Sequence, residues 1–255
     1  MKKQSANSLS FFFLLWMIST GVWCAGLCIQ PLTRKGFNPC EEARVASKNA
    51  TTFAASEAYL SALRKINSAA RDGKEHGVVF GKDANGKIVT SGISSGSFNA
   101  ATLPDIHFRF ADMHNHPNNA PPHSGDIYGF MRLAIETRGY MRFIVTANHT
   151  VFCLIPIDKN KAANFLNAYP PRPGIKDSIT GIQYQPTFPE QIIDEISEMK
   201  SWGATEESAI AFILEKYQTG VAILKQNPQG VFKRLNTREY VTVNGGKLYK
   251  AYNCP

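Results

Sequence analysis

The sequence predicts an α+β fold. Residues 51–70 carry apolar side chains at helical spacing, and residues 75–91 form two β-rich runs around an Asn-Gly pair that suits a tight hairpin turn. The elements that follow come in the order strand, helix, strands, which lacks the regular alternation of strand and helix that a barrel needs. These observations favour a mixed architecture of helices and strands.

The first expected helix covers residues 51–70 and follows an irregular lead over residues 27–48. Its apolar residues stand among many alanines, and Gly73 can end it. The apolar positions are Phe53, Leu60, Leu63 and Ile66. Two strands over residues 75–82 and 87–91 are expected next, joined by the hairpin turn.

A strand over residues 106–116 comes after the hairpin. Its period-2 alternation places five side chains on one face: Phe108, Phe110, Asp112, His114 and His116. After a Pro-rich loop, Ser124 is the expected N-cap of a helix with an apolar face, which Gly139 ends. Strands over residues 141–147 and 150–156 complete this part of the chain.

The character of the sequence changes near residue 159. Helices are expected over residues 161–168, 190–200 and 205–217, and short strands close the chain. We therefore divide the sequence into four parts: a signal peptide (1–25), a cysteine-bearing lead (26–50), a core domain (51–158) and a C-terminal elaboration (159–255).

The N-terminus has the pattern of a secretory signal peptide. A Lys-Lys pair precedes an apolar run over residues 11–18, and small residues over residues 21–26 suit cleavage near Ala25. The run is too short to span a bilayer. Lipid attachment at Cys24 is not expected, because Trp23 stands where a lipoprotein signal has a small residue. The sequence therefore predicts a secreted or periplasmic protein.

The cysteines that remain after cleavage are Cys28, Cys40, Cys153 and Cys254. An even number in an exported chain predicts two disulfides, and three pairings are open. The alternative for Cys153, which stands in an apolar run, is a small buried core residue with a free thiol.

The formal net charge is +8, and two of these charges leave with the signal peptide. The remaining excess is scattered, without a stripe of Lys and Arg interleaved with aromatics. A dedicated nucleic-acid surface is therefore not expected, and the oligomeric state is left open.

The segment most informative about function is Met113-His114-Asn115-His116-Pro117. Two histidines at i and i+2 on a strand point the same way, and Asp126 follows at the start of the expected helix. Two imidazoles and a carboxylate can hold a zinc ion. Asp112, expected on the same face, is either an acceptor for an imidazole N–H or a solvated carboxylate at the strand end.

Two segments resemble the JAMM (MPN+) zinc metalloprotease domain. Glu75-His76-Gly77-Val78-Val79-Phe80-Gly81 is similar to the strand that opens this domain, and His114-Asn115-His116-Pro117 matches its H-x-H-P motif. The bacterial RadC-type members also have H-N-H-P. The resemblance covers residues 51–158 and implies a curved sheet flanked by helices. It also implies Zn²⁺ as cofactor and Glu75 as general base, with three metal ligands: His114, His116 and Asp126.

The sequence departs from the family pattern at two positions. The family has a serine three residues before the aspartate, whereas here His123 stands at that position and Ser124 lies two before Asp126. Either residue can take the serine's role, which is to donate to the oxyanion that forms on the substrate. The family glutamate lies three residues before the glycine, whereas Glu75 lies two before Gly77.

The resemblance implies a secreted zinc hydrolase that cleaves a peptide or isopeptide bond in a protein or cell-wall-like substrate. The alternative is a non-catalytic module that keeps the fold and binds a partner, which the shifted serine permits. A RadC-like association with DNA is disfavoured by export and by the missing basic stripe. Amidohydrolase and PHP-type enzymes also use H-x-H, but on the first strand of a barrel.

Overall fold

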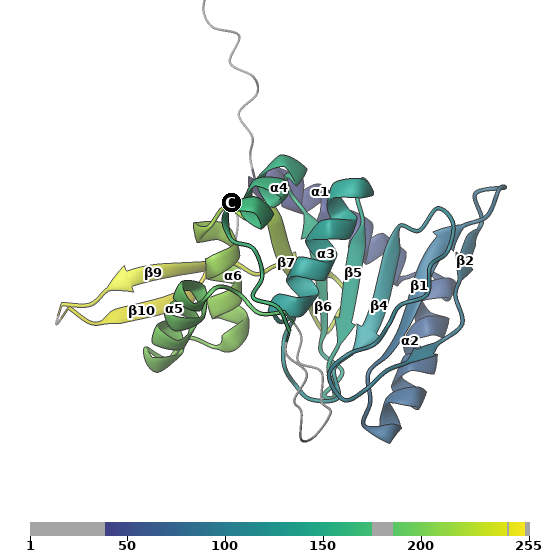
Figure 1. The fold of residues 1–255 in the computed structure, drawn as a ribbon, viewed down its shortest axis with the longest axis horizontal. Helices are drawn as coiled ribbons and strands as arrows, with labels where there is room; N and C mark the ends of the chain where they lie inside the picture. The colour runs from purple at the N-terminus through teal and green to yellow at the C-terminus, as the bar shows by residue number, and fades with distance from the viewer. Residues whose placement is uncertain (1–38, 175–185, 244, 253–255) are drawn as a thin grey trace, which may run out of the picture. The chain divides into compact units, whose positions relative to one another are not determined.

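The computed structural model describes residues 39–174, 186–243 and 245–252. In these residues the chain forms six α-helices, an open mixed sheet of eight strands and a small C-terminal hairpin (Figure 1). The expected α+β class is thereby confirmed. The predicted signal peptide lies outside the described residues, and among those described no helix has the length and apolar character needed to cross a bilayer.

The helices and strands have the following bounds. The helices are α1 (Pro39–Ala54), α2 (Glu57–Ala69), α3 (Ser124–Glu136), α4 (Lys159–Ala168), α5 (Glu190–Ser201) and α6 (Glu206–Lys216), with a short 3-10 helix over Ala70–Asp72 after α2. The strands are β1 (His76–Lys82), β2 (Ile88–Thr90), β3 (Ser94–Ser95), β4 (Ala111–Asn115), β5 (Met141–Val145), β6 (Val151–Pro156), β7 (Val221–Gln226), β8 (Phe232–Arg234), β9 (Thr237–Val241) and β10 (Lys247–Ala251).

The main sheet has the strand order β2-β1-β4-β5-β6-β7-β8, and β3 pairs with β1. β4 and β5 are parallel, because α3 carries the chain back between them, and the other neighbours are antiparallel. β7 and β8 come from the C-terminal part of the chain and extend the sheet beyond β6. β9 and β10 pair only with each other among the described strands.

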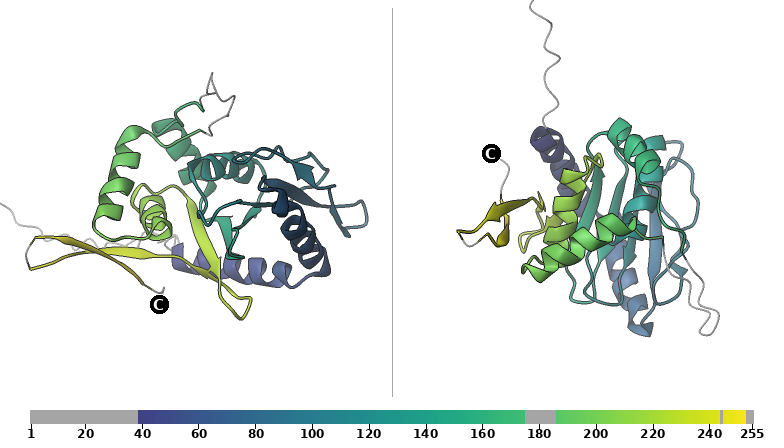
Figure 2. Two further views of the ribbon diagram at one scale, coloured as in Figure 1. Left: turned by 90° about the horizontal axis from the view of Figure 1, so that it is seen from below. Right: turned by 60° about the vertical axis from the view of Figure 1, so that its left-hand side comes forward.

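Helices cover both faces of the sheet (Figure 2). On one face α1 and α2 pack their apolar side chains on alternate strand residues such as Met113 and Phe143. On the other face α3 to α6 pack on Ile144 and Leu154. Because side chains alternate along a strand, His114 points to the face opposite Met113, which is the face that α3 covers.

Residues 51–70 form parts of two helices instead of the single helix expected, and α1 already begins within the lead that was expected to be irregular. The chain turns after α1, and Ser56 caps α2 by accepting the Tyr59 backbone N–H at 3.3 Å. The turn lets Phe53 and Tyr59 meet edge to face, with 5.7 Å between their ring centroids. Packing between these two rings favours a break in a sequence pattern that looks continuous.

The histidine strand is shorter than expected, because β4 begins only at Ala111. The preceding segment crosses Gly81 so closely that a Cβ on this glycine would lie 2.5 Å from the His107 carbonyl oxygen. Phe108 has a φ of 49° and is 75% exposed, and Phe110 packs on the face of α1. The expectation that Phe108 and Phe110 share a face with the histidines is therefore wrong.

The N-cap of α3 is His123, and not Ser124 as expected. His123 has an extended backbone (φ −98°, ψ 179°), and its side chain accepts the backbone N–H of Asp126. The Asp126 carboxylate in turn accepts the backbone N–H of His123 at 2.9 Å, so the two residues form a reciprocal capping box. Ser124 becomes the first residue of the helix.

Cys153 is buried in β6 and carries a free thiol. The expectation that it joins one of two disulfides is therefore corrected in favour of the buried core residue. Cys28 and Cys254 lie outside the described residues, as does the side chain of Cys40.

Candidate metal centre

His114, His116 and Asp126 form a buried group that could hold a metal ion. His114 is the next-to-last residue of β4 and lies on the α3 side of the sheet, and Asp126 lies in the first turn of α3. The His114 Nε2 atom lies 3.0 Å from Asp126 Oδ1, and the His116 Nε2 atom lies 3.2 Å from Asp126 Oδ2. Ligand atoms bound tetrahedrally at the usual zinc distances lie roughly 3.3 Å apart, so the spacing fits such an ion.

The ring of His116 is held with one nitrogen ready to bind a cation. Its Nδ1 lies 2.9 Å from the Ala120 carbonyl oxygen and donates to it, so in the neutral ring Nε2 carries the lone pair. This Nε2 is buried and has no hydrogen-bond partner among the described residues, although Asp126 Oδ2 is close. Two acceptor atoms that face each other in a buried site need a cation between them.

The charges in this group depend on one another. Burial opposes a charge on His116, but Asp126, the Ala120 carbonyl oxygen and Glu75 together outweigh burial and raise the pKa of His116 to about 9. Burial would also raise the pKa of Asp126, but the surrounding imidazoles of His123, His116 and His114 hold it well below its ordinary value. Without a metal ion, a proton on His116 therefore supplies the missing cation.

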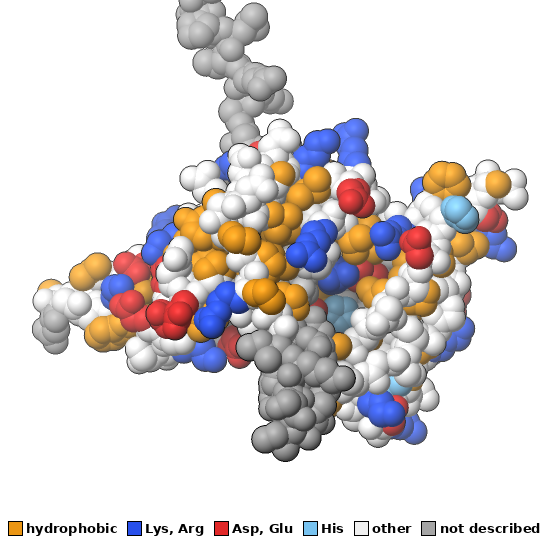
Figure 3. All heavy atoms as spheres, viewed as in Figure 1, with side chains coloured by type: hydrophobic (Ala, Val, Ile, Leu, Met, Phe, Trp, Pro, Cys, Tyr) orange, Lys and Arg blue, Asp and Glu red, His pale blue; other side chains and the backbone are white. Residues whose placement is uncertain are grey.

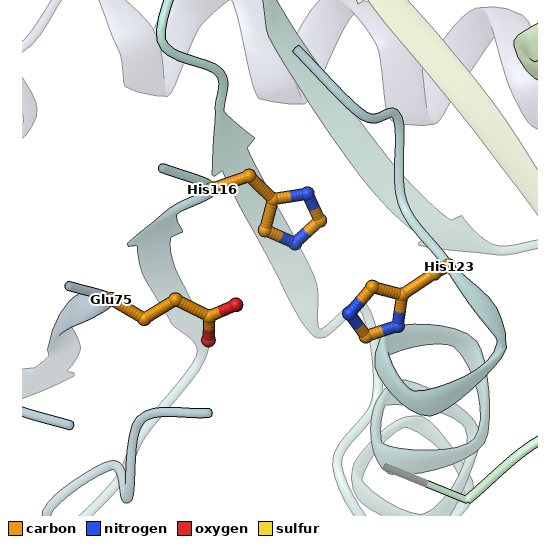
Figure 4. Close-up of side chains that lie close together, drawn as sticks. All are labelled: Glu75, His116 and His123. Atoms are coloured by element: carbon orange, nitrogen blue, oxygen red, sulfur yellow. The ribbon is translucent and has the colours of Figure 1, made fainter. Parts of the chain in front are cut away.

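Glu75 precedes β1 and is buried, and its carboxylate points toward His116 and His123 (Figure 4). One ligand atom from each of these three residues lies within 4.8 Å of the others. Burial raises the pKa of Glu75, and this outweighs the opposing effect of the histidines. A carboxyl group with a raised pKa holds a proton more firmly than a solvent-exposed one, which suits a group that accepts and later returns a proton.

His123 is the N-cap of α3, and its ring also contacts the candidate metal ligand His116. Its ring stacks on that of His116, with 5.1 Å between centroids and 7° between planes. Nδ1 accepts the Asp126 N–H, and the other ring nitrogen, Nε2, faces the space between His116 and Glu75 (Figure 4). Because Nδ1 is an acceptor, Nε2 carries the proton in the neutral ring, and burial lowers the pKa of His123 and so favours that neutral form.

A cavity of about 170 Å³ opens beside this group. The described residues that line it include Glu75, Asn99, Leu103, His114, His123, Gly125, Asp126, Gly129 and Arg142. Ser124 is not among them: its hydroxyl donates to the Pro186 carbonyl oxygen at 3.2 Å. The His123 side chain is 37% exposed, and histidine atoms are visible in a recess of the surface (Figure 3). The cavity is therefore open to solvent.

Asp112 has neither of the roles expected from the sequence. It is fully buried and accepts hydrogen bonds from Arg142 Nε at 2.9 Å, from Arg142 Nη2 at 2.8 Å and from the Tyr140 hydroxyl at 2.9 Å. Arg142 also donates from Nη1 to the Asp126 carbonyl oxygen at 3.1 Å. Sequence reasoning missed Arg142, although an arginine within the apolar run of β5 is a signal for a buried partner.

Comparison with known proteins assigns no family to this chain. No family model matches the sequence. No curated protein matches it either. The fold and the geometry of the buried group therefore carry the functional argument.

Proposed function

We propose that this protein is a secreted zinc-dependent hydrolase of the JAMM type, which cleaves a peptide or isopeptide bond. The observation that carries the proposal is the buried, unpartnered Nε2 of His116, which faces a carboxylate oxygen of Asp126 within a group that also includes His114. Zinc is the metal this donor set suits, since two imidazoles and one carboxylate make a common catalytic zinc site.

His114, His116 and Asp126 would hold the metal, and residues 51–158 would form the hydrolase unit. When bound, zinc supplies a Lewis acid that makes a water molecule acidic near neutral pH. Glu75 would accept a proton from that water and hold it until the leaving amine nitrogen takes it up. Its raised pKa and its position beside the group support this role.

His123 would donate from Nε2–H to the substrate oxygen on which negative charge develops. Its Nδ1 is used in the helix cap, which leaves the protonated nitrogen facing the cavity. Ser124, the other candidate for this role, would first have to give up its bond to Pro186. We therefore favour His123 over Ser124 as the residue that replaces the family serine.

The same bond of Ser124 favours a second candidate, a JAMM-like module that keeps the metal and binds a protein partner without cleaving it. If the serine role is essential and His123 does not fill it, the site would retain zinc and lack activity. Measurements of zinc content and of cleavage separate the two candidates.

The first experiment measures zinc in the purified mature protein and in His116→Ala, with His107→Ala as a control at an exposed histidine. We expect close to one zinc per chain in the wild type and the control, and a strong loss in His116→Ala. A wild-type protein that binds no zinc when zinc is supplied would refute the proposal.

The second experiment incubates the zinc-loaded protein with a mixed-sequence peptide library and with lysine isopeptides, and detects new amino groups by mass spectrometry. We expect cleavage by the wild type and a loss of roughly 10²- to 10⁴-fold in Glu75→Gln, with zinc retained in both. Zinc binding without cleavage in the wild type would favour the binding module.

A further inference from the structure

The backbone around Glu75 is hydrogen-bonded on both of its edges. On one edge, Glu75 uses its own backbone groups: its N–H donates to the Ser97 carbonyl oxygen at 2.8 Å, and its carbonyl oxygen accepts the Gly96 N–H at 2.8 Å. Gly96 fits there without a side chain, since a Cβ would lie 1.8 Å from the Ala100 carbonyl oxygen. The loop before β4 thus holds one edge of the segment.

The other edge is held by a side chain. The Asn115 Oδ1 atom accepts the His76 backbone N–H at 2.7 Å, and Asn115 Nδ2 donates to the Lys74 carbonyl oxygen at 3.0 Å. The two backbone groups belong to the residues on either side of Glu75, so the single amide spans it. A backbone N–H and a backbone C=O are the partners, so they fix which end of the amide carries oxygen.

The position of this contact explains why a side chain is needed. The antiparallel ladder between β1 and β4 ends at the pair Gly77↔His114, and the next pair in that register would be His76 and Asn115. At this position the Asn115 side-chain amide, and not its backbone, forms the hydrogen bonds to His76 and Lys74. On the other side of the strand end, the His116 N–H donates to the Val145 carbonyl oxygen of β5 at 2.8 Å. Asn115 is 2% exposed, so water does not compete for these bonds.

We propose that Asn115 is a positioning residue that fixes the Glu75 carboxylate relative to His114 and His116. The inference rests on the proposed role of Glu75. Asn115 lies between the two histidines in the sequence, and its side chain points to the opposite side of the strand. Its hydrogen bonds therefore connect the backbone around Glu75 directly to the backbone that carries His114 and His116. A displacement of a catalytic group by about 1 Å can lower a rate about 100-fold, so these hydrogen bonds should affect turnover.

The test compares Asn115→Ala, Glu75→Gln and the double variant in the zinc-loaded mature protein. Asn85→Ala, in the exposed turn after β1, is the control. We expect Asn115→Ala to keep its zinc and to lose about 100-fold in cleavage of the peptides that the wild type cleaves. The double variant should be no slower than Glu75→Gln, since Asn115 acts through Glu75. Loss of zinc, or additive losses in the double variant, would overturn the proposal.

Hydrogen exchange tests these hydrogen bonds independently of activity. In Asn115→Ala the His76 amide should exchange at least about 10-fold faster than in the wild type, while the Gly96 amide should change little. In the wild type, one of the two Asn115 side-chain amide protons should exchange slowly, which can be measured even if the variant does not fold. An unprotected side-chain amide would overturn the inference. If the wild type cleaves nothing, the proposed function fails, and the exchange data still decide whether Asn115 holds the segment.

Discussion

Replacing Arg142 with methionine should lower the free energy of unfolding by about 3–5 kcal/mol, the usual cost of removing one partner of a buried ion pair. Arg142 is 7% exposed and Asp112 is fully buried, so among the described residues the variant leaves the Asp112 carboxylate with the Tyr140 hydroxyl as its side-chain partner. The bond from Arg142 to the Asp126 carbonyl oxygen is lost as well, at a cost of about 1 kcal/mol. Because that bond anchors the first turn of α3, zinc affinity should fall about 10- to 100-fold.

The assay is urea unfolding of the metal-free protein, followed by zinc titration of the same variants. Arg44→Met is the control, because its pair with Glu41 is exposed and its loss should leave the unfolding midpoint unchanged. Replacing both Asp112 and Arg142 with apolar residues should recover much of the loss, because no unpaired buried charge remains. A loss below about 1 kcal/mol in Arg142→Met would refute the reasoning that the pair is a buried, mutually dependent unit.

Three further predictions concern single groups. The pKa of His116 is raised to about 9 in the metal-free protein, so zinc binding at pH 7.5 should release a proton, and zinc affinity should rise with pH towards 9. Calorimetry in buffers of different ionisation enthalpy measures this proton release. A heat of binding that does not depend on the buffer would contradict the prediction. Burial raises the pKa of Cys153, so its thiol should resist iodoacetamide at pH 8 in the folded protein and react in denaturant without reductant, as mass spectrometry of the labelled peptide would show. Gly129→Ala should destabilise the protein in urea unfolding, because the added Cβ would lie 3.0 Å from Arg142 Nη1. In an unconstrained helix alanine is more favourable than glycine by about 1 kcal/mol, so a stabilised variant would contradict the prediction.

Local sequence patterns predicted much of the fold. The hairpin of β1 and β2, the strands β5 and β6 and the two helices α5 and α6 follow from periodicity, turn residues and caps that act over a few residues. The break before Ser56 was missed because the apolar spacing continues across it, and the contact between Phe53 and Tyr59 that accompanies the break is not visible in the sequence. The true start of β4 also escaped prediction, because it depends on a loop that crosses Gly81.

The candidate site shows the same division between local and distant contacts. The spacing of His114, His116 and Asp126 indicated a metal group, and the structure brings the three together. The partner of Asp112 was missed because Arg142 lies 30 residues away and meets it only through the pairing of parallel strands. The contacts of Asn115 were hidden for a similar reason, since they lie at the first residue of β1 and just before it, 39 and 41 residues away in the sequence.

The loop between His116 and His123 has little freedom to change its length. The Ala120 carbonyl oxygen sets the rotation of the His116 ring, and the Ala120 N–H is bonded to the side chain of Asn118. The backbone of the same loop is bonded to Ala147, in the turn after β5. An inserted residue would turn the imidazole away from its neighbours, so a reporter peptide placed in this loop should abolish zinc binding. The exposed turn between β1 and β2, where the same peptide would disturb only Asp83 and its local bonds, is the better place to engineer a tag.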